Sequence, residues 1–163
     1  MDLREISDRL EIRELMDRYA MACDSKNWDA YRTIYAPDAI IDYTEFGGGR
    51  GGIDTTLEWL SAGLGPFAGL HHNLTTHYCE IDGDTAKAIT YWLAYQTLPD
   101  GSGGEFIMEC GGYYKDRLVR TDRWLISERV DVGTWVRAPF PEGFTPPSWY
   151  GTMNHHLPTL LEG

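Results

Sequence analysis

Three of the five histidines in this chain lie within seven residues, at His71, His72 and His77. Because the unperturbed pKa of histidine is about 6.5, its imidazole can take up and release a proton near neutral pH. The cluster opens a segment that reads as a β-strand, and it is the clearest chemical signal in the sequence. Plain packing in a half-buried position is the alternative for each ring. An acid elsewhere in the chain that could orient one of them would favour catalysis.

Asp24 is such an acid: it lies at the predicted end of the first helix, five residues after Tyr19. If the helix frays there, both side chains can border one pocket mouth. The carboxylate would then hold one nitrogen of a histidine on a facing strand and leave the other free as a general base. We predict that His71 and His77 are structural or face outward. No pair of histidines has a third ligand at a spacing that suits zinc, so no metal site is predicted.

The first part of the chain must supply the helices that position this acid. Apolar residues at helical spacing, and the breaks between them, predict helices over residues 3–24, 28–35 and 55–64, with a strand over 39–46. Pro37 disfavours helix in the residue before it and should end the second helix. Asp54 is predicted to cap the third helix. The glycine-rich run 47–52 lacks the GK[ST] ending of a phosphate loop and is predicted to be a turn.

The rest of the chain is predicted to be a sheet that carries the histidines. Short Gly/Asp turns separate strands predicted over 71–81, 86–98, 105–118 and 124–136, which indicates antiparallel hairpins. Three N-terminal helices packed on one face of such a sheet give an α+β fold, and a strongly bent sheet would form a cone with an open mouth. We expect one domain over residues 1–136 and a Pro- and aromatic-rich tail over 137–163.

Composition excludes several classes of function. The chain has 163 residues and a net charge of −11, which argues against nucleic acid and anionic membrane surfaces as partners. No apolar run approaches the length of a transmembrane helix, and the N-terminus is charged at once, unlike a secretory signal. Cys23, Cys79 and Cys110 lack zinc or disulfide spacing. These features predict a cytoplasmic protein.

The aromatic content is higher than a core of this size needs, with ten Tyr and six Trp. Large amphipathic rings often line pockets for flat apolar ligands. Our candidates for a substrate-binding wall are Tyr43, Trp59, Tyr91, Tyr95, Phe106 and Trp135, although each alone could equally be core. Side chains alternate along a strand, so either the Tyr91 and Tyr95 side or the Trp92 and Gln96 side of strand 86–98 meets the cavity. The sequence leaves both faces open.

Several segments together resemble a known family. They are the helix end 19–24, the run 28–31, the Tyr-Ala-Pro-Asp-Ala segment 35–39, His72, the turn 80–86, the run 111–114 and the strand that Trp124 opens. This pattern, over about residues 5–136, is similar to the SnoaL-like branch of the NTF2-like superfamily. Its members include bile acid 7α-dehydratase, scytalone dehydratase, a hexachlorocyclohexane dehydrochlorinase, polyketide cyclases and cofactor-free diarylpropane lyases.

The resemblance implies a cone-like α+β fold, often dimeric or trimeric, and a catalytic pair. In several members an Asp at the end of the first helix orients a His that removes a proton, and Asp24 and His72 match those positions. Tyr19 matches a Tyr beside the Asp in the bile acid dehydratase. That enzyme also has a second acid on the next strand, at a place that falls near Ala94 in this chain, and a C-terminal Arg that has no clean equivalent here. The substrate and the acid that assists the leaving group therefore do not carry over.

We therefore predict a cofactor-independent lyase, a dehydratase or a C–C or C–O bond-cleaving enzyme. A dyad of His72 and Asp24, with Tyr19 beside it, would take a proton from a hydrophobic aromatic or polycyclic substrate, such as a lignin-derived diaryl compound. An isomerase or cyclase with the same dyad is one alternative, and a non-catalytic binding subunit like a dioxygenase β-subunit is another. We further expect a homo-oligomer joined through the outer sheet face. The tail is expected either to close the cone mouth or to pack outside the sheet.

Overall fold

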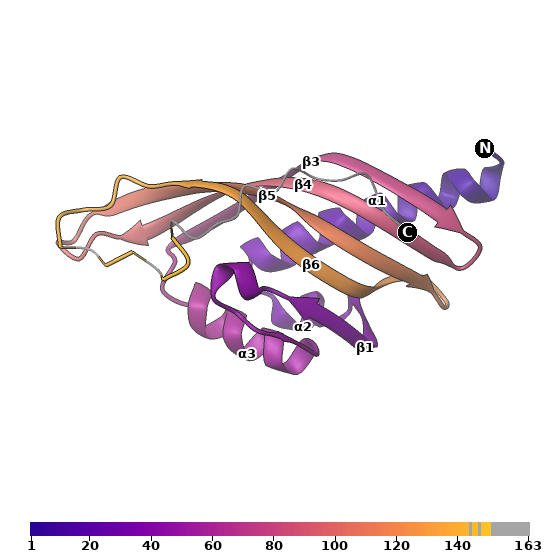
Figure 1. Ribbon diagram of the computed structural model, residues 1–163, viewed down its shortest axis with the longest axis horizontal. Helices are drawn as coiled ribbons and strands as arrows, with labels where there is room; N and C mark the ends of the chain where they lie inside the picture. The colour runs from indigo at the N-terminus through magenta and orange to yellow at the C-terminus, as the bar shows by residue number, and fades with distance from the viewer. Residues whose placement is uncertain (144, 147, 151–163) are drawn as a thin grey trace.

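The computed structural model describes residues 1–143, 145–146 and 148–150. Within these residues, three helices and a six-stranded sheet make up the fold (Figure 1). In chain order the elements are α1 (Leu3–Asp24), α2 (Trp28–Arg32), β1 (Tyr35–Asp42), a 3₁₀ turn η1 (Thr44–Phe46), β2 (Arg50–Gly51), α3 (Ile53–Leu64), β3 (Gly69–Asp82), β4 (Thr85–Pro99), β5 (Glu105–Arg120) and β6 (Trp124–Arg137). Residues 151–163 of the predicted tail, with 144 and 147, lie outside the described residues.

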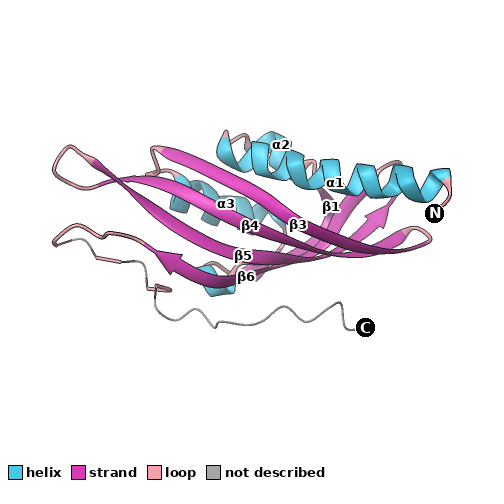
Figure 2. Ribbon diagram, turned by 90° about the horizontal axis from the view of Figure 1, so that it is seen from above, coloured by secondary structure: helices cyan, strands magenta, loops and turns pink. Residues whose placement is uncertain are grey.

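The sheet has the order β2-β1-β6-β5-β4-β3. Strands β3 to β6 form an antiparallel meander, whereas β1 pairs with β6 in parallel and with β2 in the antiparallel sense. The long strands curl, and the helices pack against the sheet (Figure 2). The predicted α+β fold, with N-terminal helices on a bent and largely antiparallel sheet, is confirmed.

Helix α1 begins and ends where the sequence predicts. The Asp2 side chain caps its start by accepting a hydrogen bond from the backbone N–H of Glu5 at 2.8 Å. Buried residues recur three or four apart along one face, at Ile12, Leu15, Met16, Tyr19 and Cys23. This face packs against β3 and β6, so the helix delivers its C-terminal residues to the inside of the sheet.

The segment after α1 departs from the sequence prediction. Helix α2 ends at Arg32, not at residue 35, and the strand occupies Tyr35–Asp42 instead of 39–46. The reason is tertiary: β1 pairs in parallel with β6, and a register shift between Tyr35 and Ile40 accommodates Pro37, which has no N–H to donate. Residues near the predicted end of this strand form the turn η1.

The third helix also starts earlier than predicted. It begins at Ile53 after Gly52, so the prediction that Asp54 caps it is wrong. Asp54 lies in the first turn, where a carboxylate is favourable near the helix N-terminus, and it forms an ion pair with Arg32 at 2.6 Å.

The main core lies between the helices and the inner sheet face. Large buried side chains such as Tyr31, Ile41 and Trp124 fill it. A smaller cluster of Ile89, Tyr113 and Val132 lies on the outer face. Within the described residues, no helix has both the length and the apolar character needed to cross a membrane.

Candidate active site

A cavity of about 420 Å³ opens between the inner sheet face, α1 and α3. Its volume lies in the range of sites that hold one small organic ligand. The described lining residues come from every layer of the fold: Tyr19, Cys23, Tyr43, Phe46, Trp59, Leu60, Phe67, His72, Trp92, Ala94, Gln96, Cys110, Tyr114, Asp131 and Trp149 are among them. Aromatic rings predominate, and only a few polar groups point inward.

His72 and Asp24 meet at this cavity. The Nδ1 atom of His72 lies 2.6 Å from Oδ1 of Asp24, and the backbone N–H of His72 donates to the same carboxylate at 3.0 and 3.2 Å. A carboxylate accepts but does not donate, so in the neutral ring Nδ1 carries the proton and Nε2 keeps a lone pair. The ring is largely buried, with a side-chain exposure of 10%. The pair is thus a fixed imidazole with one nitrogen available as a base.

Strand alternation, together with a register shift between Leu74 and His77, gives the three histidines of β3 different surroundings. His71 is exposed on the outer face, where its ring lies 6.5 Å from that of Tyr95. His77 is partly buried, and its Nδ1 lies 2.8 Å from the hydroxyl of Thr90; burial lowers the pKa of this ring. Neither residue lines the cavity. Of the cluster, only His72 reaches it.

Tyr19 lies beside the dyad, with its ring 6.5 Å from that of His72. Its hydroxyl belongs to a different network, because it lies 2.9 Å from the hydroxyl of Tyr43 and donates to that of Tyr114 at 3.1 Å. Burial raises the pKa of all three phenols well above the ordinary value, so each remains a neutral hydroxyl. The three hydroxyls meet at the cavity wall.

The predicted wall residues divide between the two sheet faces. Tyr43 and Trp59 line the cavity, and their rings stack at 5.4 Å. On β4 the inner face carries Trp92, Ala94 and Gln96, which settles the alternation that the sequence leaves open. Tyr91 and Tyr95 are therefore on the other face.

Two further candidates also lie away from the cavity. Trp135 is exposed and packs over Gly111 on the outer face of β5. Phe106 is buried with Leu98 and Met108, in a cluster beyond the cavity, and its ring lies 5.9 Å from that of Phe140.

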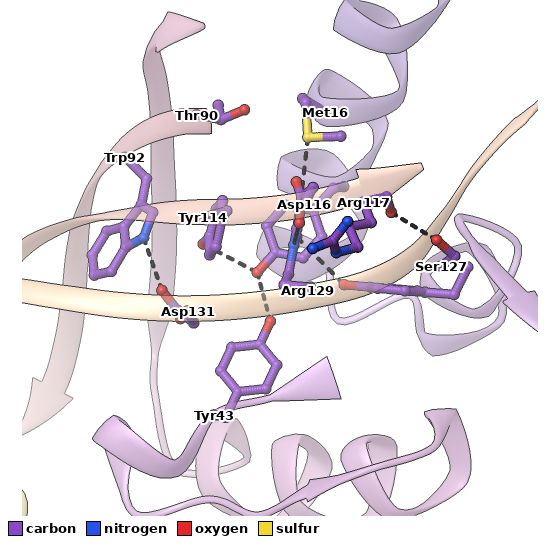
Figure 3. A network of polar contacts seen from close by, with 12 residues as sticks. Met16, Tyr43, Thr90, Trp92, Tyr114, Asp116, Arg117, Ser127, Arg129 and Asp131 are labelled. Carbon is purple, nitrogen blue, oxygen red and sulfur yellow. Dashed lines mark hydrogen bonds and ion pairs between the residues drawn. The ribbon is translucent and has the colours of Figure 1, made fainter. Parts of the chain in front are cut away.

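Asp131 is a cavity residue that the sequence reading missed. It is buried on β6, and its Oδ1 accepts a hydrogen bond from the indole N–H of Trp92 at 3.0 Å (Figure 3). Burial raises the pKa of Asp131 well above its ordinary value, against the opposing effects of Arg129 and Trp92. The neutral carboxylic acid is thereby favoured. The signal in the sequence was the run Arg129-Val-Asp131-Val, whose alternation sends both charged side chains to one face.

Trp92 can occupy its place because its cross-strand partner is a glycine. A Cβ atom on Gly112 would lie 2.1 Å from the carbonyl oxygen of Val132 and 2.7 Å from the Trp92 ring. The indole fills that space and stacks on Tyr114 with ring centroids 5.9 Å apart. Gly112 thus lets a large ring lie flat on the sheet and aim its N–H at Asp131.

The cavity cysteines have little nucleophilic character. Burial raises the pKa of Cys23 and of Cys110 to about 12, so both are neutral thiols at physiological pH. Among the described residues, no three His, Cys, Asp or Glu side chains come together in a way that could hold a metal ion. The acid–base groups at the cavity are His72 with Asp24, Asp131 and the phenols.

A SnoaL-like domain matches residues 4–130, and the chain belongs to this family within the NTF2-like superfamily. It is 36% identical over 133 residues to the uncharacterized protein Rv2910c of Mycobacterium tuberculosis, covering 81% of this chain and 89% of that protein. The structure of Kfla4162 from Kribbella flavida is similar, with a TM-score of 0.74, 29% identity and coverage of 82% and 95%. The fold is also that of hexachlorocyclohexane dehydrochlorinase LinA-type3 from Novosphingobium barchaimii, with a TM-score of 0.74, 19% identity and coverage of 90% and 100%.

Proposed function

We propose that the protein is a cofactor-independent lyase in which His72 is the general base and Asp24 its positioning partner. The observation that carries the proposal is the 2.6 Å contact between Nδ1 of His72 and Asp24, at a cavity that His72 lines. An imidazole held in this way has the tautomer and orientation that proton abstraction needs. The dehydrochlorinase noted above performs an elimination by its name, which supports the same reaction class.

In the proposed reaction, Nε2 of His72 takes a proton from a carbon or oxygen atom of the substrate. When the proton comes from carbon, its electron pair forms a C=C bond, and the hydroxyl group leaves with its own bonding pair and takes the proton back to become water. When the proton comes from a hydroxyl group, the oxygen electron pair forms a C=O bond and the adjacent C–C bond breaks. The carbonyl fragment is then released, and the other fragment keeps the pair of the broken C–C bond and takes up the proton. A neighbouring aromatic ring in the substrate would stabilise the charge and make the proton acidic enough for imidazole.

The cavity wall favours a flat and apolar substrate. Trp92 lies between the rings of Phe46 and Tyr114, at 5.8 and 5.9 Å, and Trp59 stacks on Tyr43. Such rings exclude water, which strengthens electrostatic interactions inside the site. The substrate class that we propose is an aromatic or polycyclic compound, including lignin-derived diaryl compounds.

The described part of the tail supports a role as a lid. The ring of Trp149 lies 5.5 Å from that of Phe46 and borders the cavity with Ser148. A lid in this place would close the site while the intermediate forms. We further propose that the enzyme works in the cytoplasm as a homo-oligomer, in which a partner covers the exposed outer-face side chains Tyr95, Ile107 and Trp135.

The test is a screen of aromatic diols and hydroxysteroids by mass spectrometry. A lyase product is lighter than its substrate by water or a carbonyl fragment, whereas an isomerase product has the same mass. We expect His72→Ala to lower turnover by about 10²–10⁴-fold. His71→Ala is the matched control, since it removes the neighbouring ring from the opposite face, and it should retain activity. Near-wild-type turnover of His72→Ala would remove the base assignment.

Asp24→Asn tests the positioning role separately. The amide keeps the size of the side chain but can donate to Nδ1, which would place the imidazole proton on Nε2 and abolish the base. By analogy with the orienting Asp of a catalytic triad, turnover should fall by about 10⁴-fold. Nitrogen NMR of His72 should report a changed tautomer, an effect that a purely structural role would not produce.

A further inference from the structure

Five buried tyrosine hydroxyls form one continuous chain that runs from behind the cavity to its wall. Tyr35 donates to Tyr31 at 3.0 Å, and Tyr31 lies 3.1 Å from Tyr43. The hydroxyls of Tyr43 and Tyr19 are 2.9 Å apart, and Tyr19 donates to Tyr114 at 3.1 Å. In Figure 3 the hydroxyls of Tyr43 and Tyr114 are both turned toward one shared hydrogen-bond partner. Tyr19, Tyr43 and Tyr114 line the cavity, whereas Tyr31 and Tyr35 lie behind it.

The chain begins at a group that can only donate. Arg129 Nη1 donates to the Tyr35 hydroxyl at 3.4 Å, and a guanidinium has no acceptor atom. The hydrogen of Tyr35 therefore points away from Arg129, toward Tyr31. A chain running in the opposite direction would direct that hydrogen at the cation, so the starting direction is fixed.

The Tyr114 end of the chain determines which partner donates in the two hydrogen bonds where either hydroxyl could be the donor. A phenol has one hydrogen, and Tyr19 gives its own to Tyr114. The Tyr43–Tyr19 bond must then be donated by Tyr43. With that hydrogen committed, the bond between Tyr31 and Tyr43 must be donated by Tyr31. All hydroxyls thus point the same way, from Arg129 to Tyr114.

Tyr114 is left with an uncommitted hydrogen. Its hydroxyl accepts from Tyr19, and none of the hydrogen bonds between described residues uses it as a donor. Because Tyr114 lines the cavity, this hydrogen is available to a ligand. We propose that Tyr114 is a catalytic residue that donates a hydrogen bond to a carbonyl, enol or phenol oxygen of the substrate, and stabilises the negative charge that forms there when His72 takes the proton. The catalytic part of this inference rests on the proposed function, but the donor itself does not.

The surroundings strengthen Tyr114 as a donor. Hydrogen bonds in a chain polarise one another, by roughly 10–30% per bond. The guanidinium of Arg129 also lies 4.1 Å from the ring centroids of both Tyr19 and Tyr114, and it is held there by Asp116. Burial raises the pKa of Tyr114 well above the ordinary value, so the hydroxyl keeps its proton. Donors fixed in a dry site, aimed where charge develops, are an effective source of catalysis.

Asp131 would not oppose an oxyanion beside Tyr114. The raised pKa of Asp131 favours its neutral form, which does not repel negative charge. One of its oxygens is occupied by Trp92. The substrate class therefore narrows to compounds whose removable proton is conjugated with an oxygen atom, such as hydroxyaryl or aryl ketone compounds.

The test measures binding of para-substituted phenols of similar size and different acidity, by calorimetry at constant pH. In the wild-type protein, affinity should rise as the phenol becomes more acidic, because a polarised donor binds the oxyanion better than the neutral phenol. Tyr114→Phe should weaken binding of the most acidic phenol by about 10- to 100-fold and flatten this dependence. Tyr113→Phe, the same change on the opposite face of the strand, is the matched control and should leave it unchanged.

The dependence of affinity on phenol acidity is measured on the wild-type protein alone, so the proposal can be tested even if Tyr114→Phe does not fold. Three results would each overturn the proposal. They are a wild-type protein that binds no phenol, an affinity for phenols that does not change with their acidity, and an equal loss of affinity in Tyr114→Phe and Tyr113→Phe. The two proposals can fail separately. A phenol series that behaves as expected, with no lyase activity in any screen, would remove the reaction and keep the donor. Lyase activity that persists in Tyr114→Phe would keep the proposed reaction and remove the catalytic role of Tyr114.

Discussion

Arg129 and Asp116 form an ion pair with no exposed side-chain surface on either partner. Two hydrogen bonds of 2.8 Å join them, and the guanidinium also contacts the sulfur of Met16 at 3.3 Å. Asp116→Asn would leave a buried cation without its counter-charge, and Arg129→Met would leave a buried carboxylate. Removing one partner of a buried pair costs about 3–5 kcal/mol, because the remaining charge loses its compensation inside the protein.

For a chain of this length, 1 kcal/mol corresponds to a change of roughly 2–4 °C in Tm. Each single variant should therefore melt about 6–20 °C lower than the wild-type protein. The double variant Arg129→Met/Asp116→Leu leaves no charge behind, and it should be more stable than either single variant. Urea denaturation followed by circular dichroism gives the free energies of unfolding, and calorimetry gives Tm.

Arg32→Met is the control, since it removes one partner of the exposed pair with Asp54. The side chains of this pair are 48% and 87% exposed, and such pairs contribute about 0–1 kcal/mol. Single-variant costs at Asp116 and Arg129 no larger than the Arg32→Met cost would refute the reasoning. So would a double variant whose loss equals the sum of the two single losses.

Three further predictions concern the cavity acid, the tail and the assembly. Because burial raises the pKa of Asp131, its contribution to stability is complete below about pH 4 and is lost as pH rises through the raised pKa. Asp131→Asn cannot ionise and should therefore gain stability relative to the wild-type protein with rising pH. Urea denaturation from pH 4 to 9 measures the difference in free energy of unfolding between the variant and the wild-type protein. A difference that stays constant over this range would contradict the prediction. Truncation after Arg137 removes Trp149 and should abolish turnover while circular dichroism and oligomer mass stay unchanged; unchanged kinetics in a stable truncated protein would exclude a lid. Light scattering should give a multiple of the 18.5 kDa chain mass, and a monomer mass would reject the oligomer.

The sequence was a good guide wherever local periodicity decides the structure. The apolar repeat of α1 predicted its bounds, and with them the position of Asp24 at a helix end. The Gly/Asp turns predicted the long hairpins, and with them the position of His72 near the start of a strand. These features depend on neighbours close in the chain, so a single sequence contains the information.

The sequence was a poor guide where distant segments decide. The position of strand β1 in the chain is determined by its parallel pairing with β6, which no local sequence pattern around Pro37 predicts. Strand β4 carries large side chains on both faces, so the choice between Tyr91 and Trp92 needed the sheet itself. Asp131 and Tyr114 also became visible as site residues only when their strands were adjacent, because strand alternation gives a face but does not show which face the helices cover.

The parallel pairing of β1 with β6 also constrains how the protein can be made. Asp42 and its partner Val130 are 88 residues apart in the chain, so β1 leaves the ribosome roughly 4–18 s before its partner exists, at about 5–20 residues per second. During that interval the tyrosines of the N-terminal segment have neither Arg129 nor Tyr114 to contact. Such long-range closure slows folding, and a nascent chain without β6 exposes apolar surface that chaperones recognise. Stalling before Trp124 should therefore yield a chaperone-bound chain, because the strand that completes the sheet also carries the cation behind its buried phenols.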